Sequence, residues 1–544
     1  MINIKRVLAV AAATMLSVSS LAGVPVHAVD AAVNAKLYGR VEDNGQAIYK
    51  AVIDYDNVKV VDPKVEDFTV HVKATTEGKR DADDTAYGDF DKDRKIVKVE
   101  SNGNQVEIYF DEADGAAGTL SYLAKGARNI PSDITYTITQ NKPLALTSMD
   151  GREIGSQTFE YKVDNTVYDD EVAKFKSVKV DNGINYQFYD AGKDADSLIV
   201  WFHGNGEGDY RQSGNNIAQV LANRGTVAWA TDEAQSIFGK SHVMAFQAPD
   251  TWYYANKDNL LEKAYNEIQE VVSQKGVNPK KIYVSGCSAG GYMTTRMLIK
   301  YPNYFKAAMI NCPALDVASK RGGETPTDEE LESLLKSPTA IWLVQGENDG
   351  TVNTDDCAAR IFDALIGTQE IKTTRVDQEL DSGFTTYETP DNKYKLTLYD
   401  TTDEDRSKAK LKFGEDFDQD GVKTQVEFSN HWSWIYTLRN NPKAANGDHI
   451  WNWAANYKQP SQEENKPTPT PEPKPTQQPE QKPTNNQTPT QKSEAKQPTK
   501  ASNTKTKTTT KKAVKTGDAT IVLPYVLLVI IGLAGMLVFK KRHN

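Results

Sequence analysis

Two hydrophobic patterns divide the central part of the chain. In residues 31–180, short stretches alternate apolar with polar positions, as strands with one buried face do. The clearest of these stretches are residues 51–55, 68–73, 96–100, 105–110 and 134–139. Asn102-Gly103 separates two of them and favours a tight hairpin turn. Because no long helical period appears in this segment, it predicts an all-β sandwich domain.

From residue 181 to 458 the pattern changes to continuous apolar stretches with helical segments between them. Residues 197–202 form a continuous apolar run, which is typical of a strand buried on both faces. Residues 281–285, 307–310 and 340–344 are further predicted strands. Apolar residues recur at helical spacing across residues 260–272. Strands that alternate with helices predict a doubly wound, mostly parallel sheet. In such a sheet, functional residues lie at the carboxyl ends of the strands.

The predicted strand 281–285 leads directly into the sequence Gly286-Cys287-Ser288-Ala289-Gly290-Gly291. A Gly-x-Ser-x-Gly motif between a strand and an apolar helix is typical of a nucleophile elbow, in which glycines permit the sharp turn that exposes the serine. Ser288 is therefore the predicted nucleophile. The alternative is a glycine-rich turn with an incidental serine.

A serine nucleophile needs a general base, and the base needs an orienting carboxylate. In chains with this elbow, the acid and then the histidine follow the serine. His431, on a loop between strand-like and helix-like stretches, is the predicted base, with His449 as the alternative. Asp349 follows a predicted strand and is the predicted acid, with Asp316 and Glu347 as alternatives.

The negative oxygen of a tetrahedral intermediate must be stabilised by preplaced N–H donors. Ala289, next after the nucleophile, is expected to supply one backbone N–H. The second is expected from Asn205 or Gly206, in the loop that follows the predicted strand 197–202. His203 opens this loop and is predicted to be structural rather than the base.

These motifs resemble the EstA-type secreted esterases, near the polyhydroxybutyrate-depolymerase and feruloyl-esterase branch of α/β-hydrolases. The resemblance is carried by His-Gly-Asn-Gly, Gly-Cys-Ser-Ala-Gly-Gly, Gly-Glu-Asn-Asp and Asn-His-Trp-Ser-Trp and covers most of residues 31–457. It implies an α/β-hydrolase fold in residues 181–458, preceded by an immunoglobulin-like domain in 31–180. It also implies Ser288, Asp349 and His431 as the triad. A long, acidic, hairpin-like insertion between Asp349 and His431 departs from the family pattern.

Both ends of the chain carry targeting patterns. Residues 1–28 have the basic, apolar and small-residue regions of a secretory signal. Residues 459–512, rich in Pro, Thr, Gln and Lys, predict a disordered, wall-spanning linker. In residues 513–544, Val514-Lys515-Thr516-Gly517, an apolar span and a basic tail resemble a sortase sorting signal of Gram-positive bacteria; a plain membrane anchor is the alternative. We expect a secreted, surface-anchored protein with sortase and peptidoglycan as partners.

One candidate metal site lies within the insertion. Asp416, Asp418 and Asp420, followed by Glu427, have the spacing of a calcium loop. A solvated acidic turn is the alternative, because Lys423 occupies a position that is usually apolar and no flanking helices are evident. Calcium bound here would be structural. Hydrolysis through a serine nucleophile requires no cofactor.

The charge and the cysteines exclude some functions. The net charge of −10 gives no sign of nucleic-acid binding. The three cysteines, Cys287, Cys312 and Cys357, suggest neither a disulfide framework nor a metal site, and we expect them to be buried as small apolar residues.

The leading hypothesis is therefore a carboxylic ester hydrolase that acts through an acyl-serine intermediate. Its expected substrates are short acyl or aryl esters, including acyl groups on polysaccharide. A prolyl-oligopeptidase-like serine peptidase would share the fold and the triad. A non-catalytic surface adhesin is the third hypothesis, against which the intact set of serine, aspartate and histidine argues.

Overall fold

The computed structural model describes residues 32–400 except 182, 215 and 381, the backbone of 415–417 and 423–425, and residues 430–459. All of these belong to one compact unit of the chain, Met1–Gln459. The predicted signal segment, the linker beyond residue 459 and the predicted sorting segment lie outside the described residues. Among the described residues, no helix is long and apolar enough to cross a membrane.

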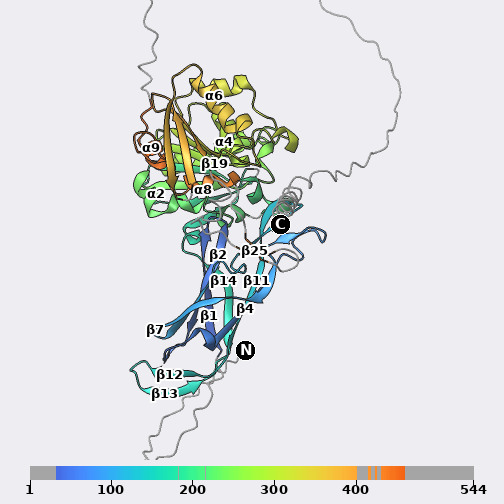
Figure 1. Cartoon of the computed structure of the whole chain (residues 1–544), viewed down its shortest axis with the longest axis vertical. Coiled ribbons are helices and arrows are strands. Elements are labelled where there is room, and N and C mark those ends of the chain that lie inside the picture. The colour runs from blue at the N-terminus through green and yellow to red at the C-terminus, as the bar shows by residue number, and fades with distance from the viewer. Residues whose placement is uncertain are drawn as a thin grey trace, which may run out of the picture. The chain divides into compact units, whose positions relative to one another are not determined.

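The N-terminal region consists of strands, drawn in blue to cyan in Figure 1. Those that the sequence predicted are confirmed, and the Asn102-Gly103 turn joins two of them, with Asn102 paired to Gln105. The strands are β1 (Val33–Glu42), β2 (Gly45–Asp54), β3 (Val58–Val60), β4 (Phe68–Thr75), β5 (Ala86–Tyr87), β6 (Phe90–Asp93), β7 (Ile96–Asn102), β8 (Gln105–Phe110), β9 (Leu120–Leu123), β10 (Arg128–Pro131), β11 (Asp133–Gln140), β12 (Leu144–Ser148), β13 (Glu153–Gln157) and β14 (Tyr161–Tyr168).

Two sheets of this region share one apolar core. A five-stranded sheet has the order β14-β1-β2-β8-β7, and a three-stranded sheet has the order β11-β4-β6. Alternating residues of β1, β2 and β8 pack with alternating residues of β4 and β11, as the period-two pattern predicts. Two further three-stranded sheets, β10-β9-β5 and β13-β12-β3, complete the region. The immunoglobulin-like assignment stays a prediction.

A ten-stranded sheet organises the rest of the described chain, with the order β15-β16-β18-β17-β19-β20-β21-β24-β23-β22. The six strands from β18 to β24 in this order are parallel, and two antiparallel strands lie at each edge. The strands are β15 (Phe175–Val178), β16 (Tyr186–Tyr189), β17 (Ser197–Phe202), β18 (Ser241–Phe246), β19 (Ile282–Cys287), β20 (Ala307–Asn311), β21 (Ala340–Gly346), β22 (Lys372–Glu379), β23 (Ser382–Glu388) and β24 (Tyr394–Tyr399).

Helices cover both faces of this sheet. Successive residues of a strand point to opposite faces, so neighbouring residues pack in different cores. Val200 of β17 packs in a core with α3, α4 and α6, whereas Trp201 packs in a second core with α2, α8 and α9. The helices are α1 (Ala218–Leu221), α2 (Asp232–Ile237), α3 (Leu260–Lys275), α4 (Ala289–Lys300), α5 (Asp328–Glu332), α6 (Arg360–Ile366), α8 (Trp434–Thr437) and α9 (Ile450–Asn456).

The predicted insertion between Asp349 and His431 is only partly a hairpin. Strands β22 and β23 pair antiparallel, as expected, but β24 joins the main sheet parallel to β21. The polar residues of β24 did not indicate a strand of the main sheet. Lys395 is nevertheless buried there, because it pairs with Glu388 at 2.7 Å. The segment after β24 is described only in two short strands, β25 (Glu415–Phe417) and β26 (Lys423–Gln425), which pair antiparallel.

Candidate active site

The sequence around Ser288 forms a sharp turn between β19 and α4. Ser288 has φ 54° and ψ −119°, a backbone conformation that is unfavourable for residues other than glycine. The turn brings α4 close to β17: a Cβ atom at Gly290 would lie 2.0 Å from the carbonyl oxygen of Phe202. Glycine is therefore required at this position, and the predicted elbow is present.

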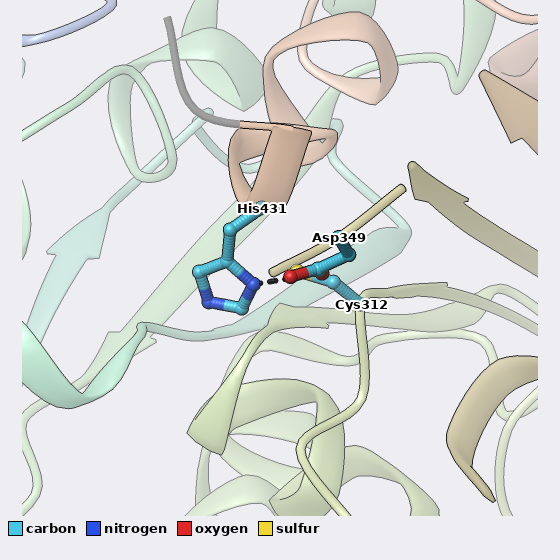
Figure 2. A group of neighbouring side chains, drawn as sticks. All are labelled: Cys312, Asp349 and His431. Carbon is cyan, nitrogen blue, oxygen red and sulfur yellow. Dashed lines mark hydrogen bonds and ion pairs between the residues drawn. The ribbon is translucent and has the colours of Figure 1, made fainter. Parts of the chain in front are cut away.

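A chain of hydrogen bonds joins Ser288, His431 and Asp349. The Nε2 atom of His431 lies 3.0 Å from the Ser288 Oγ, and its Nδ1 atom lies 2.9 Å from an Asp349 carboxylate oxygen. Figure 2 shows the second of these contacts. His431 lies in a short helix, Asn430–Trp432, and Asp349 in the loop after β21. The structure thus brings together three residues from distant parts of the sequence.

The Asp349 carboxylate is held rigidly. One oxygen, Oδ1, accepts hydrogen bonds from the backbone N–H groups of Thr351 at 2.8 Å and Val352 at 2.9 Å. The other, Oδ2, faces His431 and also accepts from the Gln345 amide at 3.3 Å. The side chain is fully buried, so its orientation is fixed by these contacts.

The alternative acid and base residues make other contacts. Asp316 accepts hydrogen bonds from the Cys357 thiol at 3.3 Å and the Asn353 backbone at 3.3 Å. The Glu347 side chain is exposed. His449 precedes α9, and its Nδ1 atom lies 2.6 Å from the Asn440 carbonyl oxygen. The geometry thus favours Asp349 and His431 over these alternatives.

Sequence reasoning did not anticipate where Cys312 lies. All three cysteines are free and buried, as predicted, but Cys312 directly follows β20 and lies beside Asp349 and His431 (Figure 2). One polar atom from each of the three residues lies within 4.8 Å of the others, an arrangement that could hold a metal ion. Both imidazole nitrogens already engage Ser288 and Asp349, so this cluster is accounted for by the hydrogen-bond chain.

These neighbours also set the basicity of His431. Burial opposes the charged imidazolium form, but Cys312 and the hydrogen bond to Asp349 favour it more strongly. The pKa of His431 is therefore raised above its ordinary value. A more basic imidazole accepts a proton from a serine hydroxyl more readily.

The predicted oxyanion donors lie at the starts of two helices. Ala289 is the first residue of α4, and Asn205 is the first residue of a short helix, Asn205–Glu207. The first N–H groups of a helix have no acceptor within the helix. In the described part of the chain, neither the Ala289 N–H nor the Asn205 N–H donates a hydrogen bond to a backbone carbonyl. We call residues 203–208 the oxyanion loop.

Within the oxyanion loop, the geometry favours Asn205 over Gly206. A Cβ atom at Gly204 would lie 3.8 Å from the Ser288 Cβ, so the Gly204–Asn205 backbone lies against the nucleophile. Gly206 instead faces the side chain of Asn129 in β10, 3.1 Å from where its Cβ would be. His203 is buried, and its Nε2 accepts a hydrogen bond from the Ala248 backbone at 2.9 Å. Burial lowers its pKa to about 3, consistent with the predicted structural role.

The candidate calcium site is not described beyond its backbone. Asp416 lies in β25, whereas Asp418, Asp420 and Glu427 lie outside the described residues. Calcium binding therefore stays a prediction from the sequence.

Comparisons with known proteins match the fold and the elbow region. Residues 216–334, which include Ser288 and α4, match the model of the prolyl oligopeptidase family. The crystal structure of a thermostable esterase is 20% identical, with a TM-score of 0.53, over 75% of this chain and 96% of that one. An acetyl xylan esterase from Aspergillus awamori is 16% identical, with a TM-score of 0.32, over 42% of this chain and 93% of that one.

A comparison with curated protein sequences found no match. The solved esterase supports the α/β-hydrolase fold, and the family match lies over the predicted nucleophile. The described chain accordingly has an α/β-hydrolase fold, and part of it, residues 216–334, is similar to a family of serine peptidases.

Proposed function

We propose that the protein is a serine esterase that acts through an acyl-enzyme intermediate. The observation that carries the proposal is the hydrogen-bond chain from the Ser288 Oγ through His431 to Asp349. A serine hydroxyl on a strained turn, in contact with an imidazole that a buried carboxylate orients, is the arrangement that nucleophilic acyl transfer requires.

In the first half-reaction, the Nε2 atom of His431 takes the proton from Ser288 as the Oγ attacks the ester carbonyl carbon. Asp349 keeps the proton on Nδ1, so that Nε2 is free to accept. The backbone N–H groups of Ala289 and Asn205 stabilise the oxyanion that forms. His431 then gives its proton to the departing alkoxide, and the acyl group stays on Ser288.

In the second half-reaction, water replaces the alcohol. His431 takes a proton from the water as the water oxygen attacks the acyl carbon. The same two N–H groups stabilise the oxyanion. The bond to the Ser288 Oγ then breaks, and the Oγ recovers its proton from His431. The products are a carboxylic acid and the free enzyme.

The choice of an ester rather than a peptide is supported by the thermostable esterase, which this chain matches over 96% of that protein's length. We propose short acyl or aryl esters as substrates, including acyl groups on polysaccharide. The match to the prolyl oligopeptidase family over residues 216–334 supports a serine peptidase as the second candidate. Both reactions would use the same nucleophile and base.

We further propose that the enzyme acts outside a Gram-positive cell, attached to its surface. The support is the sequence alone: a secretory signal pattern in residues 1–28, a polar linker, and the sorting-signal-like segment 513–544. Sortase and peptidoglycan would then be its partners in attachment.

The test is hydrolysis of a p-nitrophenyl ester series from acetate to laurate, compared with a prolyl p-nitroanilide peptide substrate. The wild type should release p-nitrophenol from the short esters, and Ser288→Ala should abolish turnover, because the Ser288 Oγ is the atom that carries the acyl group in the proposed mechanism. Cleavage of the anilide without ester turnover would favour the peptidase. Ester turnover that persists in Ser288→Ala would refute the assigned nucleophile.

A further inference from the structure

A buried carboxyl group lies within the oxyanion loop. Glu207 ends the short helix Asn205–Glu207 and is 7% exposed. One of its carboxyl oxygens lies 3.0 Å from the position of a Cβ atom on Gly204. Because Gly204 itself lies against Ser288, the Glu207 carboxyl directly supports the backbone that faces the nucleophile.

Two amide side chains hold the Glu207 carboxyl from outside the loop. Asn129 of β10 donates to it at 3.4 Å, and Asn223, which follows α1, donates at 3.5 Å. Gln247 donates to the Glu207 backbone carbonyl. The loop is thus fixed from the N-terminal β region on one side and from the ten-stranded sheet on the other.

The hairpin formed by β9 and β10 is itself anchored to the hydrolase region next to this contact. Arg128, adjacent to Asn129, donates to the backbone oxygen of Asp250 at 3.0 Å and to its carboxylate at 2.8 Å. Gly208, at the end of the oxyanion loop, also lies against this point, since its Cβ would be 2.0 Å from the Asp250 carbonyl oxygen. Asn129 is therefore held in a fixed position against Glu207.

The charge of Glu207 affects catalysis because its carboxyl group lies against Gly204, next to the nucleophile. Burial raises the pKa of Glu207 to about 7, and Arg128 opposes this rise only in part. The His203 Nδ1 atom lies 3.9 Å from a Glu207 carboxyl oxygen, but His203 is neutral because burial lowers its pKa to about 3. The nearby Cys287 thiol is kept protonated, because burial raises its pKa. An ionised Glu207 would place a negative charge beside the developing oxyanion and oppose its formation.

We propose that Glu207 is a positioning residue: its carboxyl group, held by Asn129 of the β9–β10 hairpin, fixes the Gly204–Asn205 backbone against Ser288. The activity of the hydrolase region then depends on a contact from the N-terminal β region. The inference rests on the proposed function, in which the Asn205 N–H stabilises the oxyanion.

The experiment measures kcat and KM for p-nitrophenyl acetate from pH 6 to 9 in the full-length protein. The variants are Glu207→Gln, Glu207→Ala, Asn129→Ala and the last two combined, with the exposed Glu332→Gln as the matched control. Glu207→Ala and Asn129→Ala should each lower kcat about tenfold with little change in KM, because the donor is misplaced only for the transition state. Their combination should lower kcat no further than Glu207→Ala alone.

The pH profile separates positioning from a general structural role. Glu207→Gln keeps the shape of the side chain but cannot ionise. The ratio of its kcat to that of the wild type should rise about tenfold between pH 6 and 9, whereas the Glu332→Gln ratio should stay flat. The proposal is overturned if the Glu207→Gln ratio is independent of pH, or if the effects of Glu207→Ala and Asn129→Ala on kcat are additive.

A second readout keeps this inference distinct from the esterase proposal. The rate at which a fluorophosphonate labels Ser288 reports on the same nucleophile and oxyanion donors without any ester substrate. If the wild type is labelled but does not hydrolyse esters, the esterase proposal fails, and the labelling rates of the variants still decide the role of Glu207. If the wild type is not labelled, both proposals fail.

Discussion

Replacing Asp349 by asparagine should abolish the base function of His431 without disturbing the fold. The Asp349 Oδ1 accepts two backbone N–H bonds, from Thr351 at 2.8 Å and Val352 at 2.9 Å. An asparagine must therefore direct its carbonyl oxygen to these donors, since the opposite orientation would place an NH₂ group against two N–H groups. Each such unsatisfied buried contact costs about 1–3 kcal/mol.

This orientation turns the asparagine NH₂ group toward His431. The Nδ1 atom, 2.9 Å from the replaced oxygen, must then accept a hydrogen bond rather than donate one. The imidazole proton moves to Nε2, which lies 3.0 Å from the Ser288 Oγ. Nε2 can then no longer accept the serine proton, so the resting enzyme holds the wrong tautomer.

A forced tautomer of this kind lowers kcat by about 10⁴-fold in serine hydrolases, or about 5 kcal/mol of transition-state stabilisation. The assay is p-nitrophenyl acetate hydrolysis by Asp349→Asn at neutral pH, with circular dichroism to verify folding. Asp316→Asn is the matched control, because Asp316 bonds to Cys357 and Asn353 instead. A loss of less than tenfold in Asp349→Asn, or an equal loss in Asp316→Asn, would refute the assignment of the acid.

Two further predictions concern the base and the elbow. The acidic limb of the kcat/KM profile of the wild type should have its midpoint above about pH 6.5, because the pKa of His431 is raised and only the neutral imidazole accepts a proton; a midpoint at or below this value would contradict the environment described for His431. Gly290→Ala should lower the free energy of unfolding by about 3 kcal/mol, because the added Cβ would lie 2.0 Å from the Phe202 oxygen. Urea denaturation measures this effect, with Gly350→Ala as the control for stability, since a Cβ there meets nothing within 4 Å; equal effects in the two variants would contradict the close approach.

The sequence was most informative where local pattern determines structure. Strands β17, β19, β20 and β21 are apolar at nearly every position because both faces of a central parallel strand are covered. The elbow motif is likewise local, because strand, turn and helix follow one another. These features predicted Ser288 as the nucleophile and required an acid and then a histidine to follow it in the sequence.

What the sequence did not show depends on pairing between distant segments. Strand β24 has the mixed composition of a surface hairpin, and its Lys395 is buried only because Glu388 of the neighbouring strand neutralises it. The contact of Asn129 with Glu207 joins residues 78 positions apart, from regions with different hydrophobic patterns. No periodicity within either segment contains that information.

The strand order also explains Cys312. Strands β19, β20 and β21 are neighbours, so Ser288 and Asp349 extend from strands separated by one intervening strand, a lateral spacing of about 10 Å. The imidazole of His431 spans this distance with a hydrogen bond at each end. The residue that directly follows the middle strand therefore lies beside the imidazole, where a small side chain fits. Cys312 occupies that position (Figure 2), and its location follows from the geometry of the triad.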